Sequence, residues 1–542
     1  MKIKALFFLL FVMIGGSSSA TNYYINSQSG SDTYDGRSKD RPFKTVIPVR
    51  SISLQPGDSI LFATGLQYSG MLYVSDVKGV NGHPIVISSY SFRNDTTKPT
   101  LDAGNDLNAI LLRNTSHIEI SQLELTARIP VEKNSINKSE LRCGVLVEVT
   151  KEEVFENIML KHLVVHDVYY NEPGFKRSAA ETKSANGTQS YGWGIRFINQ
   201  SKKGVMKQLS VAFCKVFNVS HTGIKFTAPA EGIKEIKVNN NEVYHTGGPG
   251  MQFSGVSDGH IHHNNIHHSG SIQDTRNWGR GSGLWTWSCT NILIEHNRFE
   301  YANGPGDSAG VHIDFNCSHV VVQYNFSANN AGGFCEILGN NYNCSYRYNI
   351  SVNDGYRVKG KDGAFQEGKI FWLSGYQGDK QKPTGPFNSY FYNNTMYVGT
   401  GIVPKVAVSA TATGILIMNN IFHFEDTAVM VAGDQFKTDA NLLQTGNAIF
   451  KNNLFLRADN WPTAITLQDM NPLMGDPQFH KKAGASLVDY KPLNIKLIKD
   501  KGLMIPKLPG DSIGIKIGLN MDRDILGNKI KGRPDMGAIE LQ

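Results

Sequence analysis

The segment ILIEHNRF (residues 292–299) is followed by VVVQYNF (320–326) and YRYNI (346–350), and the three stretches share one pattern. Each begins with alternating apolar residues, reaches an Asn and ends on another apolar residue. Related units occur on both sides, at residues 236–243, 260–266, 390–396, 415–421 and 449–455. The units recur about every 25 residues, stretched by insertions, which is typical of one turn of a β-solenoid.

The last Asn of each unit marks the position at which we expect the chain to bend. These residues are Asn241, Asn265, Asn297, Asn325, Asn349, Asn394, Asn420 and Asn453. Stacked amides can hydrogen-bond from coil to coil, and each coil runs the same way as its neighbour. The pattern therefore predicts an all-β chain folded as a single-stranded, right-handed parallel β-helix. Propeller blades need longer antiparallel repeats, and leucine-rich repeats need Leu at fixed offsets, which are absent.

The chain divides into segments of different character. We predict a signal peptide at 1–20, an N-terminal cap with the first rungs at 21–100, a parallel β-helix at 101–474 and a capping or return segment at 475–542. Polar insertions at 170–191 and 354–387 are expected to form loops beside a groove.

The start of the sequence predicts export. Lys2 and Lys4 precede an apolar run at 6–14, and small residues ending at Ala20 follow. This arrangement is typical of a cleavable signal peptide and indicates a secreted or periplasmic protein without a membrane span. The formal charge of +7 suits an anionic partner. No dense Lys/Arg cluster with interleaved aromatics indicates nucleic acid.

The six cysteines lack the paired spacing of a zinc site. Cys289 and Cys317 stand at the same offset before the Asn of their units, so we expect them to stack in adjacent coils. They would form either a disulfide or an inert thiol pair.

The central coils each contain a Gly followed by an alternating strand, from GIRFI (194–198) to GFCEI (333–337). Because residues two apart share a face of a strand, one column of side chains points outward. We expect this column to contain Arg196, Lys225, Gln252, Trp285 and His312, with Trp287 and Asp314 one step along. Flat indoles that face outward are suited to stacking on sugar rings, unless a loop buries them.

Three acids accompany this column. Asp307 lies in a Gly-rich bend, Asp314 ends the next strand, and Glu336 follows one coil later. Two carboxylates across a groove can divide into acid and base in glycoside hydrolysis. The hypothesis is that Asp314 acts as base or nucleophile, Asp307 or Glu336 as acid, and His312 as orienter. Alternatively, Asp307 only caps a turn.

Two further histidines are expected beside the groove. His221 and His245 each precede Thr-Gly in consecutive coils, next to Lys225 and Gln252. The run HIHHNNIHH (260–268) is interpreted as surface and turn residues, because the bend separates its histidines. No metal site is predicted.

The segment at 23–46, the Asn-marked coils and the closing DMGAIE (535–540) resemble secreted bacterial β-helix proteins, most of which are carbohydrate-active. The resemblance covers nearly the whole mature chain. It implies a polysaccharide or oligosaccharide substrate, but it does not separate glycoside hydrolases from polysaccharide lyases, since one scaffold hosts both.

Three functions follow from these residues. A glycoside hydrolase acting on an anionic plant or algal polysaccharide would use the carboxylates and no cofactor. A polysaccharide lyase would use Lys225 as base and Arg196 to neutralise a uronate, with calcium as a possible cofactor. A non-catalytic glycan-binding β-helix would not need acids clustered with aromatic residues.

Overall fold

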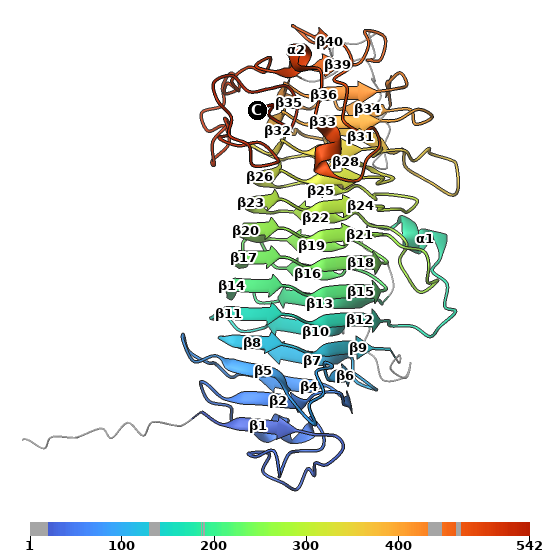
Figure 1. Cartoon of the computed structure of the whole chain (residues 1–542). Coiled ribbons are helices and arrows are strands. Elements are labelled where there is room, and N and C mark those ends of the chain that lie inside the picture. Colours follow the sequence, from blue (N-terminus) through green and yellow to red (C-terminus); the bar gives the residue numbers. More distant parts are fainter. Residues whose placement is uncertain (1–19, 129–140, 186, 188–189, 432–446, 462–467) are drawn as a thin grey trace, which may run out of the picture.

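The computed structural model describes residues 20–128, 141–185, 187, 190–431, 447–461 and 468–542. These residues form an elongated stack of coils (Figure 1). Three parallel sheets run along the stack, and each coil supplies strands to them in turn. The predicted parallel β-helix is confirmed. The predicted signal peptide falls, except for Ala20, outside the described residues.

The first sheet pairs strands from successive coils in parallel register. Its strands are β1 (Asn22–Ile25), β2 (Ser59–Ala63), β5 (Ile85–Tyr90), β8 (Ile118–Ser121), β11 (Val154–Lys161), β14 (Val205–Ala212), β17 (Ile233–Asn239), β20 (Val256–His262), β23 (Thr290–Glu295), β26 (Ser318–Gln323), β29 (Ser345–Arg347), β32 (Phe387–Tyr392), β35 (Thr413–Met418) and β38 (Asn447–Lys451).

The second sheet follows the bend that the asparagines mark. Its strands are β3 (Gln67–Ser69), β6 (Thr100–Asp102), β9 (Glu124–Ala127), β12 (Val164–Val168), β15 (Lys215–Val219), β18 (Glu242–Thr246), β21 (Asn265–His267), β24 (Arg298–Glu300), β27 (Phe326–Ala328), β30 (Ile350–Val352), β33 (Thr395–Val398), β36 (Ile421–Phe424), β39 (Leu454–Phe455) and β40 (Leu473–Met474).

The third sheet contains the Gly-initiated strands. Its members are β4 (Leu72–Ser75), β7 (Asn108–Arg113), β10 (Arg142–Val149), β13 (Gly192–Asn199), β16 (Ile224–Thr227), β19 (Met251–Ser254), β22 (Leu284–Trp287), β25 (Val311–Ile313), β28 (Gly333–Ile337), β31 (Lys369–Leu373), β34 (Lys405–Val408) and β37 (Val429–Met430). The segment 354–387, predicted as a loop, therefore contains a strand, β31.

The core lies inside the coils, where alternate side chains of the three sheets meet. Along the third sheet, Ile195, Ile224 and Met251 are fully buried and in register. Phe197 and Phe226 stack with ring centroids 4.5 Å apart. Parallel stacking thus repeats the same inward position in every coil, as the alternation predicts.

An amide ladder runs along the bend between the first and second sheets. The Nδ2 of Asn297 donates to Asn325 Oδ1 at 3.0 Å, and Asn325 Nδ2 donates to Asn349 Oδ1 at 3.0 Å. The predicted equivalence of these bends is confirmed. In the unit at 260–266, however, the ladder residue is Asn264 and not Asn265, because Asn264 Nδ2 donates to Asn297 Oδ1 at 2.9 Å.

A column of glycines allows close stacking at the start of the third-sheet strands. A Cβ built on Gly223 would lie 2.7 Å from the carbonyl oxygen of Gly250, and one on Gly250 would lie 2.8 Å from that of Gly283. Any side chain there would force adjacent coils apart. Glycine is therefore required at these positions, because the backbones of adjacent coils approach too closely for a side chain. The close approach keeps the outward face of the sheet in register.

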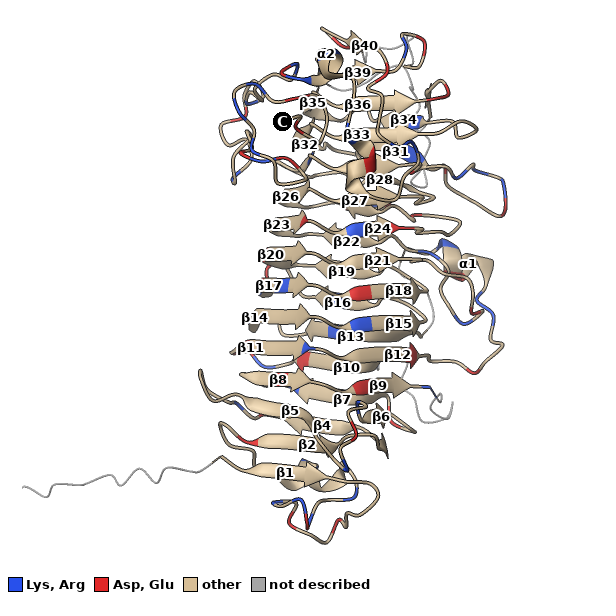
Figure 2. Ribbon diagram, in the orientation of Figure 1, with Lys and Arg blue, Asp and Glu red and all other residues tan. Residues whose placement is uncertain are grey.

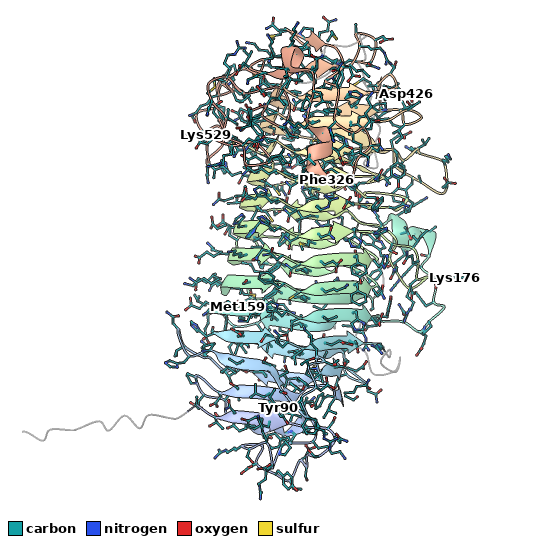
Figure 3. All side chains as sticks on the ribbon, viewed as in Figure 1. Tyr90, Met159, Lys176, Phe326, Asp426 and Lys529 are labelled. Carbon is teal, nitrogen blue, oxygen red and sulfur yellow. The ribbon has the colours of Figure 1, made fainter. Side chains whose placement is uncertain are left out.

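Two parts of the chain flank the coils. The insertion at 170–191 carries α1 (Ala179–Lys183) and stands on one side, where Figure 3 labels Lys176. The C-terminal segment carries η2 (Leu487–Tyr490) and α2 (Ile495–Ile498), and Figure 3 labels its Lys529 on the opposite flank. Another short helix, η1 (Ile47–Ser51), lies near the N-terminus. No helix among the described residues is long and apolar enough to span a membrane.

The C-terminal segment packs along the first and second sheets. Tyr390 lies against Asp511, and Asn393 Nδ2 donates to the carbonyl of Asp535 at 2.9 Å. The segment packs against Tyr390 and Tyr392 of β32 and against Leu416 and Met418 of β35, and all four side chains are buried. It therefore runs back along the outside of these coils.

All six cysteines are free thiols. Cys289 and Cys317 occupy adjacent coils as predicted, and the backbone N–H of Cys289 donates to Cys317 Sγ at 3.4 Å. They form a buried thiol pair and not a disulfide.

Candidate active site

The register of the third sheet places the predicted outward column in one row. Arg196 pairs with Lys225, Lys225 with Gln252, Gln252 with Trp285, and Trp285 with His312. Strand spacing in a sheet puts neighbouring members about 4.8 Å apart. Figure 2 shows that charged residues are spread along the whole stack. The row differs from the rest of the surface because its side chains are buried and combine basic, amide and aromatic groups.

The row opens onto a cavity of about 270 Å³. Its lining comprises Ala185, Lys225, Thr227, Gln252, Ser254, Arg280, Trp285, Trp287, Asp307, His312, Asp314, Phe315, Leu338 and Tyr376. Ala185 belongs to the insertion at 170–191, and Tyr376 belongs to the segment at 354–387. Both insertions therefore contribute a wall, as predicted.

Asp307 is held as a carboxylate at the end of the cavity. Arg280 donates to it through two nitrogens, Nε to Oδ2 at 2.8 Å and Nη2 to Oδ1 at 3.0 Å. Although burial opposes ionisation, the Arg280 guanidinium holds the pKa of Asp307 below its usual value. The backbone N–H of Asp307 donates to Gln366 Oε1 at 2.7 Å. The Asp307 carboxylate is thus held in the cavity wall by an ion pair with Arg280, in addition to its place in the turn.

Asp314 shares the cavity but has the opposite electrostatic surroundings. Its side chain accepts a hydrogen bond from the Phe315 backbone N–H at 2.8 Å. Burial raises its pKa to about 7, and the charge of Asp307 adds to the increase. The two carboxyl groups therefore differ in ionisation near neutral pH, which is the condition for dividing acid and base roles.

His312 lines the cavity with these acids, and Glu336 lies next to it in the row. The Nδ1 of His312 is 3.2 Å from Ser282 Oγ and 3.8 Å from Glu336 Oε2. Burial lowers the pKa of His312 to about 4, so the imidazole is neutral at pH 7. Burial raises the pKa of Glu336 well above its usual value. Glu336 lies in the outward row, but it is not among the residues that line the cavity.

The two tryptophans have different surroundings. Trp285 is 4% exposed, stacks on His312 with centroids 5.2 Å apart, and packs beside Tyr191 and Trp278. The insertion thus buries much of this indole. Trp287 is 39% exposed and meets Phe315 edge to face at 5.8 Å. Trp287 is the more accessible platform for a sugar ring.

Besides Glu336, three predicted site residues lie outside the cavity lining. His221 is buried and stacks on Trp278 with centroids 4.7 Å apart, so it supports the wall from behind. His245 lies within β18 on the second sheet, with its ring centroid 5.3 Å from that of His268, and does not line the cavity. Arg196 lies in the row beside Lys225, one strand beyond the cavity lining. His245 is separated from the cavity because β18 belongs to the second sheet, whereas the row belongs to the third.

Arg280 is the functional candidate that the sequence analysis missed. It stands three residues before Gly283, as Asp307 stands three residues before Gly310, and these glycines start paired strands. The equal offset indicates that Arg280 and Asp307 lie next to each other in adjacent coils. Arg280 Nη1 also donates to the carbonyl of Lys183 at 2.6 Å, which fastens α1 to the cavity.

A larger cavity of about 340 Å³ lies between the first sheet and the C-terminal segment, lined by Asp258, His260 and Lys516 among others. Its Asp258 is exposed and bonded to Asn291. Volume alone therefore does not identify the reactive site, and the smaller cavity with its buried acids is the better candidate. Among the described residues, no cluster of three or more His, Cys, Asp or Glu side chains has the arrangement of a metal site.

The class that this fold and cavity define is a parallel β-helix with a carboxylate pair on its third sheet. Comparison with protein families agrees: residues 193–363 match the model described as a right handed beta helix region. The right-handed sense predicted from the sequence is thereby confirmed.

Individual relatives are named as glycosidases. The chain is 25% identical over an alignment of 626 residues to lacto-N-biosidase from Bifidobacterium longum subsp. longum, covering 97% of this chain and 36% of that protein. A GH136 lacto-N-biosidase structure from Eubacterium ramulus aligns with 17% identity and a TM-score of 0.51, covering 84% of this chain and 68% of the other. The predicted resemblance to β-helix carbohydrate-active enzymes is confirmed, and the chain spans about a third of the curated relative it matches.

Proposed function

We propose that this protein is a glycoside hydrolase that acts on a glycan in the manner of a lacto-N-biosidase. The observation that carries the proposal is the pairing of Asp307 and Asp314 in one cavity, with pKa values displaced in opposite directions. The exposed Trp287 beside them offers a face for a sugar ring. The curated relative supports the choice of glycosidase over other β-helix functions.

Hydrolysis requires one carboxyl to protonate the leaving oxygen while the other attacks carbon or activates water. Asp307 is ionised near neutral pH, and Asp314 holds a proton below about pH 7. This order is the reverse of the predicted roles, in which Asp314 is the base or nucleophile. A substrate that develops positive charge at its anomeric carbon stabilises whichever carboxylate faces it. The ionisation states alone therefore do not assign the acid and base roles. Rate measurements on variants of Asp307 and Asp314 assign them.

Two alternatives from the sequence give different products. A lyase would use Lys225, whose amine pKa is well below its ordinary value because it is buried beside Arg196. Lys225 lies three strands from His312, about 14 Å along the row. A single glycosidic bond therefore cannot lie within reach of both Lys225 and the acids. A non-catalytic binder would give no product.

Product analysis tests the proposal. The protein is incubated with an aryl lacto-N-bioside and with neutral and acidic polysaccharides, including plant and algal ones, and the products are examined for new reducing ends and for unsaturated sugars. New reducing ends without unsaturation support the hydrolase. Unsaturated ends would show a lyase, and binding without products would show a glycan-binding solenoid.

We further propose that the protein acts after export. The Lys-initiated apolar segment at the start of the sequence supports this. Expression in a bacterial host with sequencing of the N-terminus tests it: a mature start near Thr21 is expected, and an intact Met1 in the cell interior would contradict it.

A further inference from the structure

Two adjacent cations in the outward row have no counter-charge within the described part of the chain. Arg196 and Lys225 are paired across neighbouring strands, and each is only 8% exposed. Among the described residues, neither forms an ion pair. By contrast, the buried Arg280 pairs with Asp307. Glu148, an acid on the neighbouring strand β10, is already bonded to Arg113.

The polar atoms around these cations are also incompletely bonded. The Nε and Nη1 atoms of Arg196 find no hydrogen-bond acceptor in the described part of the chain, and its guanidinium lies over Trp193 at 4.4 Å. The Oε1 of Gln252 and the Oγ1 of Thr227 are buried and unbonded within the same described residues. Leaving buried charged and polar groups unpaired is unfavourable, so a partner from outside the chain is indicated.

The surroundings increase this cost. The residue before Arg196 in the row is Leu146, in an apolar cluster that includes Cys143. Burial and the neighbouring Arg196 charge both lower the pKa of the Lys225 amine, and burial lowers that of Arg196. An anion placed between them would reverse both effects.

Lys225 connects the cations to the proposed reaction site. It lines the same cavity as Asp307 and Asp314, at the end away from the acids. Between the two ends lie Gln252, whose amide suits sugar hydroxyls, and the exposed indole of Trp287, which suits a sugar face. A ligand that reaches both ends must therefore be longer than the unit being cleaved.

We propose that the Arg196–Lys225 end of the cavity binds an anionic substituent, a carboxylate or a sulfate ester, on a sugar other than the one whose bond is cleaved. This inference rests on the proposed function for the identity of the ligand as a glycan. It specifies that the natural substrate is acidic. Arg196 supplies planar donors and Lys225 a point charge, which is a pair that accepts either oxyanion.

Titration with small probes tests the proposal without any turnover. Methyl glucuronide, methyl galactoside 6-sulfate and neutral methyl galactoside are titrated by NMR into the full chain and its Lys225→Met variant. Lys237→Met, an exposed lysine on β17, is the matched control. We expect at least one acidic probe to bind ten times more tightly than the neutral one, a preference that Lys225→Met removes and Lys237→Met keeps. The probe that is preferred identifies carboxylate or sulfate.

Thermal melting separates a ligand site from a structural lysine. Removing an unpaired buried charge should leave Lys225→Met as stable as the parent or more stable, and an acidic probe should raise the melting temperature of the parent only. If Lys225→Met does not fold, Lys225→Gln replaces it in the titration. Equal binding of acidic and neutral probes, no binding of either acid, or unchanged preference in the variant would overturn the inference. Hydrolysis of a neutral lacto-N-bioside would still stand in those cases, and anion binding without hydrolysis would refute only the proposed function.

Discussion

Arg280 forms a bidentate ion pair with Asp307 of the adjacent coil, with Nε 2.8 Å from one carboxylate oxygen and Nη2 3.0 Å from the other. Both side chains are almost fully buried, at 3% and 7% exposure. The pair joins the insertion at 170–191 to the cavity, because Arg280 also donates to the carbonyl groups of Lys183 and Ser184.

Replacing Arg280 by Met should therefore impair both stability and catalysis. The variant leaves a buried carboxylate without its cation, which destabilises by about 3–5 kcal/mol. It also raises the pKa of Asp307, so kcat/KM should fall at least 100-fold. Chemical unfolding and initial rates measure the two effects. Arg298→Met, which breaks a more exposed pair with Glu300, should change neither strongly, and equal behaviour of the two variants would refute the role of Arg280.

Asp314 should make stability depend on pH in a defined direction. Its folded pKa is about 7, above the ordinary value of 3.8, so its protonated form stabilises the fold at low pH. That stabilisation is lost as the pH rises through about 7. Asp314→Asn stays uncharged, so it should melt higher than the parent above pH 7, with the difference vanishing at acidic pH. A difference that is constant with pH, or that grows at acidic pH, would contradict this.

Trp287 should contribute to substrate affinity and little to folding. Its indole is 39% exposed at the cavity, and stacking on an aromatic face is worth about 0.5–1.5 kcal/mol. Trp287→Ala is expected to raise KM about two- to tenfold with a nearly unchanged melting temperature. Phe213→Ala removes a similarly exposed aromatic from a distant bend and should leave KM unchanged. An unaltered KM in Trp287→Ala would remove it from the site.

The two neighbouring asparagines Asn264 and Asn265 should differ in importance. Asn264 donates to Asn297 and accepts from Asn241, whereas Asn265 Oδ1 has no partner among the described residues. Asn264→Ala should cost about 1–3 kcal/mol, because it leaves ladder groups unbonded. Asn265→Ala should cost clearly less in the same urea titration. A larger loss of unfolding free energy in Asn265→Ala than in Asn264→Ala would show that the ladder register is wrong.

The sequence was sufficient to predict the fold because the coil pattern is local and repeated. Alternation gave the inward residues, and the recurring Asn gave the bend. The register failed by one residue at 264 because His263 takes the place that an Asn takes in other units with adjacent asparagines, such as Asn393 and Asn419. The residue before the ladder Asn takes a positive φ, here His263 at 55°, and a histidine does not indicate that conformation. The strand β31 was missed because it lies inside a long polar insertion, although Gly368 precedes it as glycines precede several other third-sheet strands.

The candidate site was predicted in part. The outward row followed from the glycine positions, since each starts a strand in the same register. The burial of Trp285 did not follow, because it depends on the path of an insertion that has no periodicity. Arg280 was missed for a related reason: it lies in a loop, and only its offset from Gly283 connects it to Asp307.

The most direct test of the account measures initial rates on aryl lacto-N-biosides with poor and good leaving groups, for the parent, Asp307→Asn and Asp314→Asn. Both variants should lose at least about 100-fold in kcat with the poor leaving group, because each removes one of the two carboxylates. One variant should recover on the good leaving group, which needs no proton, and that variant identifies the acid. Near-normal turnover by either variant with the poor leaving group would contradict the proposed carboxylate pair.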